Sequence, residues 1–262
     1  MLESQYGTSA NLETRLSLHD RCSTNRYGWQ RFVFDHFRFP PGTAVLELGC
    51  GTGKLWSSNL HSISADCQFV LSDASMGMVD TAREQLAPHM RNAVFVQIDA
   101  QAIPYAEASF DMVIANHMLN HVPDIPAALR EMRRVLKPGG YLYTATNGEG
   151  HLKELITLLS AYDERIDFGE DAMHSFTLEN GPGQLAQYLS VISVHRYLDH
   201  FLIDDPEPLI AYIMSSKGIG NVNEILDEKR LPDFRKYVNL LIRKNYPLRI
   251  GKDPGMIVSY RA

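Results

Sequence analysis

The stretch A-V-L-E-L-G-C-G-T-G-K at Ala44–Lys54 joins an apolar run to a loop that contains three glycines. The run is apolar apart from Glu47 and predicts a buried strand. The loop places Gly49, Gly51 and Gly53 at alternate positions. Glycine reaches backbone conformations that a Cβ forbids, and it lets a ligand lie against the main chain. The stretch therefore predicts a ligand site directly after a buried strand.

Two common phosphate-binding motifs do not fit this loop. A dinucleotide fingerprint, G-x-G-x-x-G, needs a glycine three residues after Gly51, and that position is Lys54. A P-loop needs a glycine five residues before the glycine of its G-K pair, and that position is Leu48. The pattern that remains is E-x-G-x-G-x-G, from Glu47 to Gly53.

Composition limits the classes of protein that the chain can belong to. Its 262 residues suffice for one large α/β domain, or for a domain with a lid. The formal net charge of −6 argues against a nucleic-acid partner, because binding phosphates needs clustered Lys and Arg. The N-terminus lacks the apolar core of a signal peptide, and no run approaches the roughly 20 apolar residues of a membrane span. We therefore expect a cytoplasmic protein without a membrane partner.

Short apolar runs alternate with helical patterns between about residues 43 and 146. The runs are Ala44–Leu48, Gln68–Ser72, Val94–Ile98, Asp111–Ala115 and Tyr141–Thr146. The clearest helical pattern has apolar residues at spacings of three and four from Ile125 to Leu136, and it ends at the K-P-G-G of Lys137–Gly140. Strand–helix alternation implies parallel strands joined by right-handed crossovers, with helices on both faces. We predict an α/β, doubly wound sheet.

The pattern is looser on both sides of this core. Helices are expected around Trp29–Phe37, Leu152–Tyr162 and Phe234–Leu241. Partial alternation predicts one long strand over Val191–Ile203, and Met256–Tyr260 predicts a short final strand.

The chain shows no repeat or linker that would divide it, so we expect a single domain over residues 1–262. It would comprise an N-terminal helical cover at 1–40, a core at 41–146, a lid-like insertion after the fifth strand at 147–190, and the C-terminal part of the sheet at 191–262.

Five ordered blocks resemble the class I S-adenosylmethionine-dependent methyltransferases, in particular the type 11 methyltransferase domain of the small-molecule type. They are E-x-G-x-G-x-G at Glu47–Gly53, L-S-D-A-S-M-G-M at Leu71–Met78, Q-I-D-A-Q-A-I-P-Y at Gln97–Tyr105, S-F-D-M-V at Ser109–Val113 and R-V-L-K-P-G-G-Y-L at Arg134–Leu142. The resemblance implies a Rossmann-like, mostly parallel seven-stranded sheet. It also implies S-adenosylmethionine as the cofactor, a ligand without phosphate, for which a glycine platform and acids would suffice.

Asp73 ends the second expected strand, where a doubly wound sheet holds its ligands. The resemblance implies that it binds the cofactor's ribose, since a carboxylate can accept hydrogen bonds from both hydroxyls of a diol. The alternative is that Asp73 caps the next helix, although Ser75 suits that role better. Asp99 and the backbone of Ala100 match the positions that bind adenine in the family, but Asp99 could also be a cap or turn residue.

The other cofactor positions that the resemblance implies lie in the same blocks and just after the fourth strand. They are Glu47, Gly49, Gly51, Gly53, Ala74, Met78, Asn116 and His121.

The segment N-H-M-L-N-H-V-P-D at Asn116–Asp124 carries two histidines four residues apart. A zinc motif of the H-E-x-x-H type needs a glutamate where Met118 stands, and no third ligand is evident. The three cysteines of the chain also lack a C-x-x-C pair, so we expect no metal. The resemblance implies that His121 packs against the donor. His117 is a candidate general base because histidine titrates near neutral pH, or else a polar lining residue.

Two further candidates lie outside these blocks. His151 follows the fifth expected strand and could contact the acceptor, or lie in the first turn of the next helix. In the leader, Asn25, Tyr27 and Trp29 could close the pocket, or Trp29 could be a core residue and Asn25 a cap.

The function that these patterns favour is methyl transfer to a small-molecule acceptor by in-line displacement, with a histidine base as an option. One alternative is a nicotinamide-dependent oxidoreductase, against which the missing fingerprint glycine and Glu47 count. The other is a protein that binds S-adenosylmethionine without catalysis.

Overall fold

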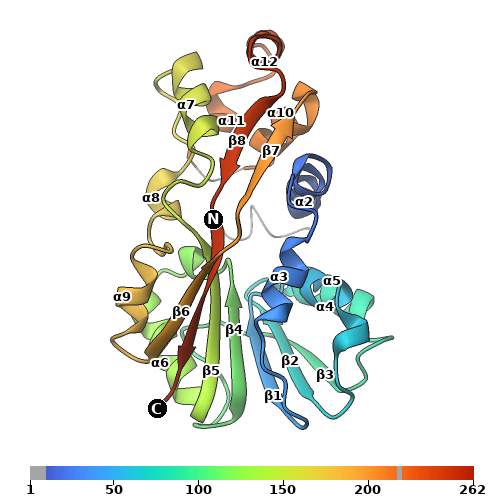
Figure 1. Ribbon diagram of the computed structural model, residues 1–262, viewed down its shortest axis with the longest axis vertical. Coiled ribbons are helices and arrows are strands. Elements are labelled where there is room, and N and C mark those ends of the chain that lie inside the picture. Colours follow the sequence, from blue (N-terminus) through green and yellow to red (C-terminus); the bar gives the residue numbers. More distant parts are fainter. Residues whose placement is uncertain (1–9, 217–219) are drawn as a thin grey trace. The chain divides into compact units, whose positions relative to one another are not determined.

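The computed structural model describes residues 10–216 and 220–262 (Figure 1). They form two compact units. The first, which we call the sheet unit, comprises Tyr27–Glu149, His174–Tyr197 and Pro254–Ala262. The second, the small unit, comprises the described residues up to Arg26 together with Gly150–Met173 and Leu198–Asp253. The chain passes between the units several times, so neither unit is a continuous segment.

The sheet unit contains a seven-stranded sheet with the order β3-β2-β1-β4-β5-β9-β6. The strands are β1 (Ala44–Leu48), β2 (Gln68–Asp73), β3 (Ala93–Gln97), β4 (Phe110–Asn116), β5 (Leu136–Asn147), β6 (Ser190–Arg196) and β9 (Pro254–Tyr260). The first five run parallel to one another, and β9 is antiparallel to both β5 and β6. The prediction of a doubly wound, mostly parallel α/β sheet is confirmed.

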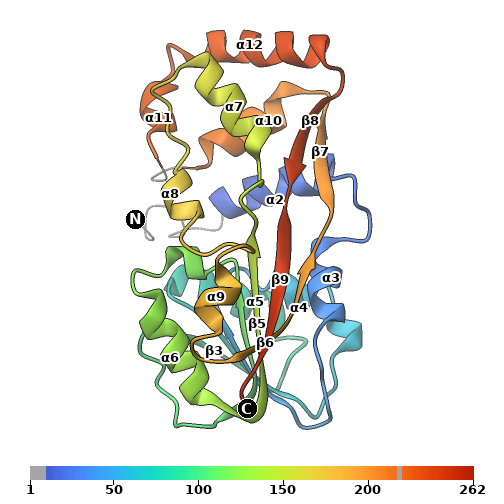
Figure 2. The ribbon, with the colours of Figure 1, turned by 60° about the vertical axis from the view of Figure 1, so that its left-hand side comes forward.

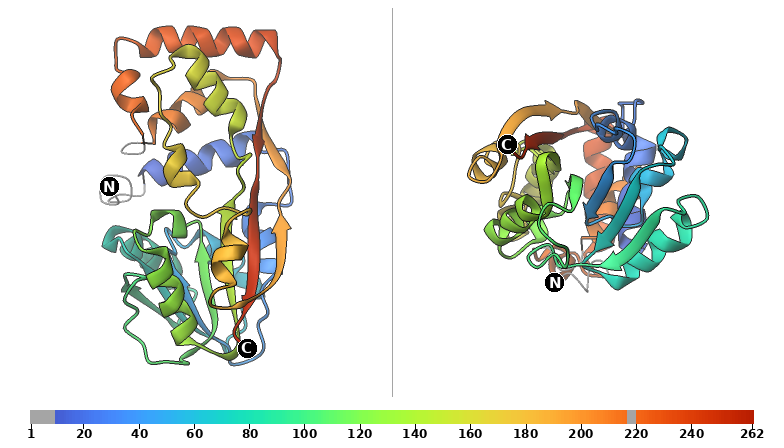
Figure 3. Two further views of the ribbon diagram at one scale, coloured as in Figure 1. Left: turned by 90° about the vertical axis from the view of Figure 1, so that its left-hand side faces the viewer. Right: turned by 90° about the horizontal axis from the view of Figure 1, so that it is seen from below.

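Helices cover both faces of this sheet. One face carries α3 (Trp29–Asp35), α4 (Lys54–Ser57) and α5 (Met76–Leu86), and the other carries α6 (Ile125–Val135) and α9 (Gly181–Leu185) (Figures 2 and 3). Two short 3-10 helices, η1 (Leu60–Ser62) and η2 (Leu119–His121), lie in the connections.

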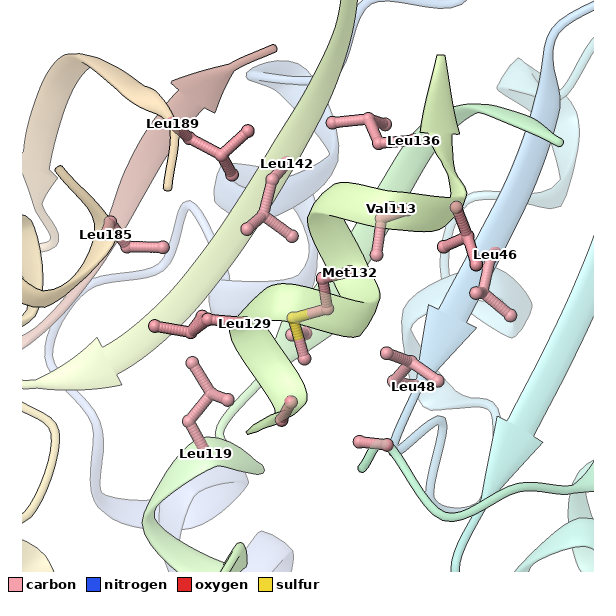
Figure 4. Packing of buried hydrophobic residues seen from close by; sticks show 14 of the residues in the cluster. Leu46, Leu48, Val113, Leu119, Leu129, Met132, Leu136, Leu142, Leu185 and Leu189 are labelled. Carbon is pink, nitrogen blue, oxygen red and sulfur yellow. The ribbon is translucent and has the colours of Figure 1, made fainter. Parts of the chain in front are cut away.

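Side chains alternate between two hydrophobic clusters along the strands. Leu46 and Leu48 of β1 pack in the cluster that includes α6, whereas Val45 packs in the cluster that includes α4. Figure 4 shows the first cluster, with Leu129 and Met132 of α6 beside side chains from the strands. This two-sided burial explains why the parallel strands are nearly continuous apolar runs.

The predicted end of the helix before β5 was wrong by a few residues. Asp124 caps the start of α6, its carboxylate accepting a hydrogen bond from the Ala127 N–H at 2.8 Å. The helix ends at Val135, since Leu136 is already extended and begins β5. Gly139 adopts a φ of +85°, but as part of the strand's turn and not as a helix cap.

The small unit is mainly helical. Its helices are α2 (Ala10–Cys22), α7 (Lys153–Tyr162), α8 (Glu170–Met173), α10 (Pro206–Met214), α11 (Val222–Ile225) and α12 (Leu231–Lys244), and β7 (Asp199–Ile203) pairs antiparallel with β8 (Leu248–Lys252). Its core includes Leu155, Phe201, Ile213 and Phe234.

The predicted long strand over Val191–Ile203 was wrong. It is two strands, of which β6 pairs with β9 in the sheet unit and β7 pairs with β8 in the small unit. Alternation of side chains marks a strand but does not name its partner, so it cannot show where the chain leaves one sheet for another.

The prediction of one domain stays a prediction, as do its internal boundaries at residues 40, 146 and 190. The compact units divide the expected insertion, placing Gly150–Met173 in one unit and His174–Tyr197 in the other. The first nine residues of the expected N-terminal cover, from which the absence of a signal peptide was argued, lie outside the described residues. Over residues 10–216 and 220–262, no helix has both the length and the apolar character to cross a membrane.

Candidate functional site

The glycine loop after β1 has the backbone that its sequence predicts. Gly49, Gly51 and Gly53 have φ values of +77°, +54° and +78°, a region that side chains with a Cβ rarely adopt. The loop is also closely packed: a Cβ on Gly53 would lie 2.5 Å from Leu86 Cδ1, and one on Gly49 would lie 2.8 Å from Met118 Cβ. Both backbone conformation and space therefore require glycine at these positions.

Asp73 closes this loop from the end of β2. Its carboxylate accepts hydrogen bonds from the Gly51 N–H at 3.0 Å and from the Ser75 N–H at 2.9 Å. Ser75 is the residue that caps α5, its hydroxyl accepting a hydrogen bond from the Met78 N–H. Burial raises the pKa of Asp73, against the effect of these backbone donors. Asp73 thus organises the loop without serving as the helix cap, while its contact with ribose stays a prediction.

Glu47 lies beneath the loop, only 2% exposed. The indole N–H of Trp56, on α4, donates a hydrogen bond to its carboxyl group at 2.5 Å. Burial raises the pKa of Glu47 to about 8; the bond from Trp56 opposes the shift and the nearby charge of Asp73 adds to it. Glu47 is therefore a protonated, neutral side chain at pH 7.

Asp99 follows β3 and is exposed. Its carboxylate accepts hydrogen bonds from the backbone and side-chain N–H groups of Gln101, at 2.9 and 3.0 Å. Ala100 beside it is buried. The carboxylate is held by a local turn and remains open to solvent, which is compatible with both the adenine and the turn interpretations.

Asn116 ends β4, the strand next to β1 in the sheet. Its side-chain oxygen is buried and has no hydrogen-bond partner among the residues that the structure describes. Buried polar atoms are rarely left unsatisfied, so a native protein with such an atom calls for an explanation. An atom like this at the ligand edge of a sheet is suited to receive a donor from a bound molecule.

His117 has a strained backbone, with a φ of +51°. Its N–H donates to the Ala145 carbonyl at 2.8 Å, which holds the residue at the end of the strand. The side chain is accessible, yet the protein atoms around it displace much of the bulk water. This desolvation, with a smaller effect of the charge of His121, lowers the pKa of His117 to about 4. The imidazole is therefore neutral at pH 7.

The ring of His117 contacts Trp29, with 5.2 Å between the ring centroids. Trp29 begins α3 and also packs edge-on against Tyr197 at 5.5 Å. The Tyr197 hydroxyl oxygen accepts a hydrogen bond from the Gly28 N–H at 3.1 Å. Trp29 is thus half-buried beside His117, as a wall of the candidate site. Sequence reasoning missed Tyr197, because nothing in its neighbourhood marks it as a partner of a residue 168 positions earlier.

The other leader candidates have structural partners. The Tyr27 hydroxyl donates to the Asp35 carboxylate. Asn25 belongs to the small unit, where its side chain donates to the Leu198 carbonyl at 3.0 Å.

His151 also belongs to the small unit, whereas the residues of the glycine-loop site belong to the sheet unit. It is buried, and its Nδ1 accepts a hydrogen bond from the Asp253 N–H at 3.1 Å. It lies two residues before α7, so it is not in the first turn of that helix. Its role toward an acceptor stays a prediction.

The remaining candidates lie at one edge of the sheet. The glycine loop, Asp73, Asp99 and Asn116 follow or end β1, β2, β3 and β4, which are adjacent and parallel, so they share the carboxyl edge at which such sheets bind ligands. Ala74 and Met78 lie at the start of α5 beside Asp73, and His121 lies in η2. Among the described residues, no group of three or more His, Cys, Asp or Glu side chains could hold a metal ion.

Comparison with known proteins agrees with this geometry. Residues 46–144, which include the glycine loop and the ends of these strands, match the family described as the methyltransferase domain. The chain contains a class I S-adenosylmethionine-dependent methyltransferase domain. The matched residues cover Asp73, Asp99 and Asn116 but neither Trp29 nor His151.

Relatives of the methyltransferase domain resemble part of the chain. The ubiquinone/menaquinone biosynthesis C-methyltransferase UbiE of Hahella chejuensis is 39% identical over 116 residues, which are 44% of this chain and 47% of that protein. The chain spans about half the length of the curated relatives it matches.

Solved structures extend the likeness in fold. A SAM-dependent methyltransferase from Aquifex aeolicus has a TM-score of 0.57 at 12% identity, covering 95% of this chain and 98% of that one. The cyclase SpnF has a TM-score of 0.57 at 17% identity, covering 88% and 80%. Since a cyclase shares the fold of the methyltransferase domain, the fold alone does not fix the reaction.

Proposed function

We propose that the chain transfers a methyl group from S-adenosylmethionine to a small-molecule acceptor. The observation that carries this proposal is the E-x-G-x-G-x-G loop of the methyltransferase domain, with three glycines at positive φ and Asp73 bonded to Gly51. This backbone leaves room for a ligand at the carboxyl edge of the sheet but offers it no phosphate motif.

The residues at this edge fit S-adenosylmethionine. The exposed carboxylate of Asp99 and that of Asp73 can accept hydrogen bonds from the amino group and hydroxyls of a nucleoside. The orphaned oxygen of Asn116 would gain a donor from the amino-acid part or the ribose of the ligand. When bound, this cofactor supplies a methyl group on a sulfonium that is already activated for displacement.

What the protein must then do is hold the acceptor in line and, where the acceptor requires it, take a proton. His117 is placed at the end of β4 and is neutral at pH 7, so its imidazole can accept a proton. Its low pKa makes it a weak base, which favours positioning as the main source of rate. Trp29 beside it offers an apolar wall typical of small-molecule pockets.

The curated relatives named above are C-methyltransferases of quinone biosynthesis, and their likeness to this chain covers the donor-binding half. We therefore propose the class of acceptor, a small molecule, and leave the methylated atom to experiment. The net charge of −6 supports this choice over a nucleic acid.

Calorimetric titration tests donor binding. We expect the full chain to bind S-adenosylmethionine and S-adenosylhomocysteine but not NAD. Tight binding of NAD without binding of either sulfur compound would make the oxidoreductase the correct assignment.

Turnover needs a second experiment, because binding alone does not distinguish an enzyme from a sensor. The chain would be incubated with methyl-labelled S-adenosylmethionine and a small-molecule extract, and the labelled products identified by mass spectrometry. The Asp73→Ala variant serves as the matched control, since it should lose donor affinity. A donor-binding protein that labels nothing above this control in any extract would contradict the proposal of catalysis.

A further inference from the structure

Glu47 is surrounded on every side by elements of the sheet unit. In the sheet it lies opposite Leu71 of β2 and Ile114 of β4. Its backbone carbonyl accepts a hydrogen bond from the Ser72 hydroxyl at 2.7 Å. On α4, Trp56 donates to its side chain. Glu47 is therefore a fixed carboxyl group with one neutral donor bound to it.

The ionisable groups that act on Glu47 are acids. Asp73 on β2 raises the pKa of Glu47 through its negative charge, and the thiol of Cys50 in the glycine loop is itself affected by both carboxyl groups. Two carboxylates in a buried region repel each other, and burial disfavours the charged form of each. Asp73 has two backbone donors to stabilise its charge, whereas Glu47 has the indole of Trp56. The proton therefore resides on Glu47.

A buried acid pair that holds one proton can take up a positive charge in its place. S-adenosylmethionine carries two such charges, an ammonium and a sulfonium, while adenosine carries none. A cation that enters beside the acid pair stabilises the carboxylate form and lowers the free energy of releasing the proton.

We infer that Glu47 is a specificity-determining residue of the proposed donor site: it is protonated in the free protein and releases its proton when a ligand with a positively charged amino-acid group binds. This inference rests on the proposed function. The O–H bond of the carboxyl group breaks, the proton passes to the buffer, and the remaining carboxylate neutralises the ligand's charge.

The expected size of the effect follows from the titration of Glu47. With a pKa of about 8 in the free protein, roughly 0.9 proton leaves for each ligand bound at pH 7. The dissociation constant should fall about 50-fold between pH 6 and pH 8, because the free protein needs to lose less of its proton as pH rises.

The test is isothermal titration calorimetry of the full chain at pH 6, 7 and 8, in buffers of different ionisation enthalpy. The ligands are S-adenosylmethionine, S-adenosylhomocysteine, which keeps the ammonium, and adenosine. The variant Glu47→Gln mimics the protonated acid, and Glu84→Gln makes the same change at an exposed position on α5. Comparing each variant with the wild type cancels the titration of the ligand's own amine.

We expect proton release with the two charged ligands in the wild type and in Glu47→Gln's matched control Glu84→Gln, and none with adenosine. Glu47→Gln should lose the release and the steep pH dependence together. Charged ligands that bind the wild type without releasing a proton would overturn the inference while leaving the proposed function intact. Failure to bind S-adenosylmethionine at any pH would instead refute both.

A second measurement avoids the variant altogether, in case Glu47→Gln does not fold. Difference infrared spectroscopy of the wild type should show the band of a protonated carboxyl group disappear, and that of a carboxylate appear, when S-adenosylmethionine binds. Adenosine should leave both bands unchanged. An unchanged carboxyl band with bound S-adenosylmethionine would also overturn the inference.

Discussion

Replacing Glu47 with glutamine should make the stability of the sheet unit less sensitive to pH. Glutamine has the shape of a protonated glutamate, and its side-chain oxygen can still accept the hydrogen bond from Trp56. It cannot ionise, however. The substitution therefore removes the titration of this site and preserves most of its packing.

The magnitude follows from the pKa of Glu47, which burial raises from 4.5 to about 8. Below pH 4.5 the group is protonated in both the folded and the unfolded chain, so it has no effect on the pH dependence. Between pH 4.5 and 8 the unfolded chain has lost the proton and the folded one has kept it, so stability falls as pH rises. At about 1.4 kcal/mol for each pKa unit, the wild type should lose roughly 3 to 4 kcal/mol between pH 5 and pH 8 through this group alone.

Urea denaturation followed by tryptophan fluorescence measures this effect. The chain has two tryptophans, Trp29 and Trp56, and both belong to the sheet unit, so the signal reports the unfolding of that unit. We expect the Glu47→Gln variant to gain stability relative to the wild type as pH rises from 5 to 8, and Glu84→Gln to follow the wild type. Parallel pH profiles for the wild type and Glu47→Gln would show that Glu47 ionises normally and would refute the reasoning.

Three other substitutions test the rest of the structure. Asp73→Asn should weaken the binding of S-adenosylmethionine by roughly 1.5–3 kcal/mol, typical of hydrogen bonds to a charged group, and an unchanged calorimetric dissociation constant would limit Asp73 to holding the loop. His117→Ala should keep donor affinity and lower turnover by about 10²–10⁴, with a wild-type rate that is flat above pH 6 and falls toward pH 4; a variant with wild-type turnover would exclude His117 as a base. Asp199→Asn should destabilise the small unit by about 3–5 kcal/mol, because it leaves the buried ammonium of Lys252 without its partner, and circular dichroism during urea denaturation would show an unshifted midpoint if the pair were unimportant.

Local signals in the sequence were sufficient for the core of the sheet. The apolar runs located β1 to β5 within a few residues, except for the early start of β5, because a buried strand needs continuous apolar side chains wherever it pairs. The same holds for the glycine loop, whose alternate glycines matched positive φ values, and for Ser75, which caps α5. Each of these features depends on residues that are close together in the chain.

Features that depend on distant partners were not available from the pattern. The division of Val191–Ile203 into β6 and β7 follows from pairing with β9 and β8, more than 40 residues later. The contact of Trp29 with Tyr197 is of the same kind.

The sequence by itself determined a doubly wound sheet, a glycine loop that excludes two phosphate motifs, and the acids that follow the strands. Only the tertiary structure decided the chemical state of those residues. Glu47 is neutral because folding buries it beside Asp73, and His117 is neutral because folding surrounds it with protein. A side chain's charge depends on the water and the charges that the whole fold leaves around it, which no short stretch of sequence specifies.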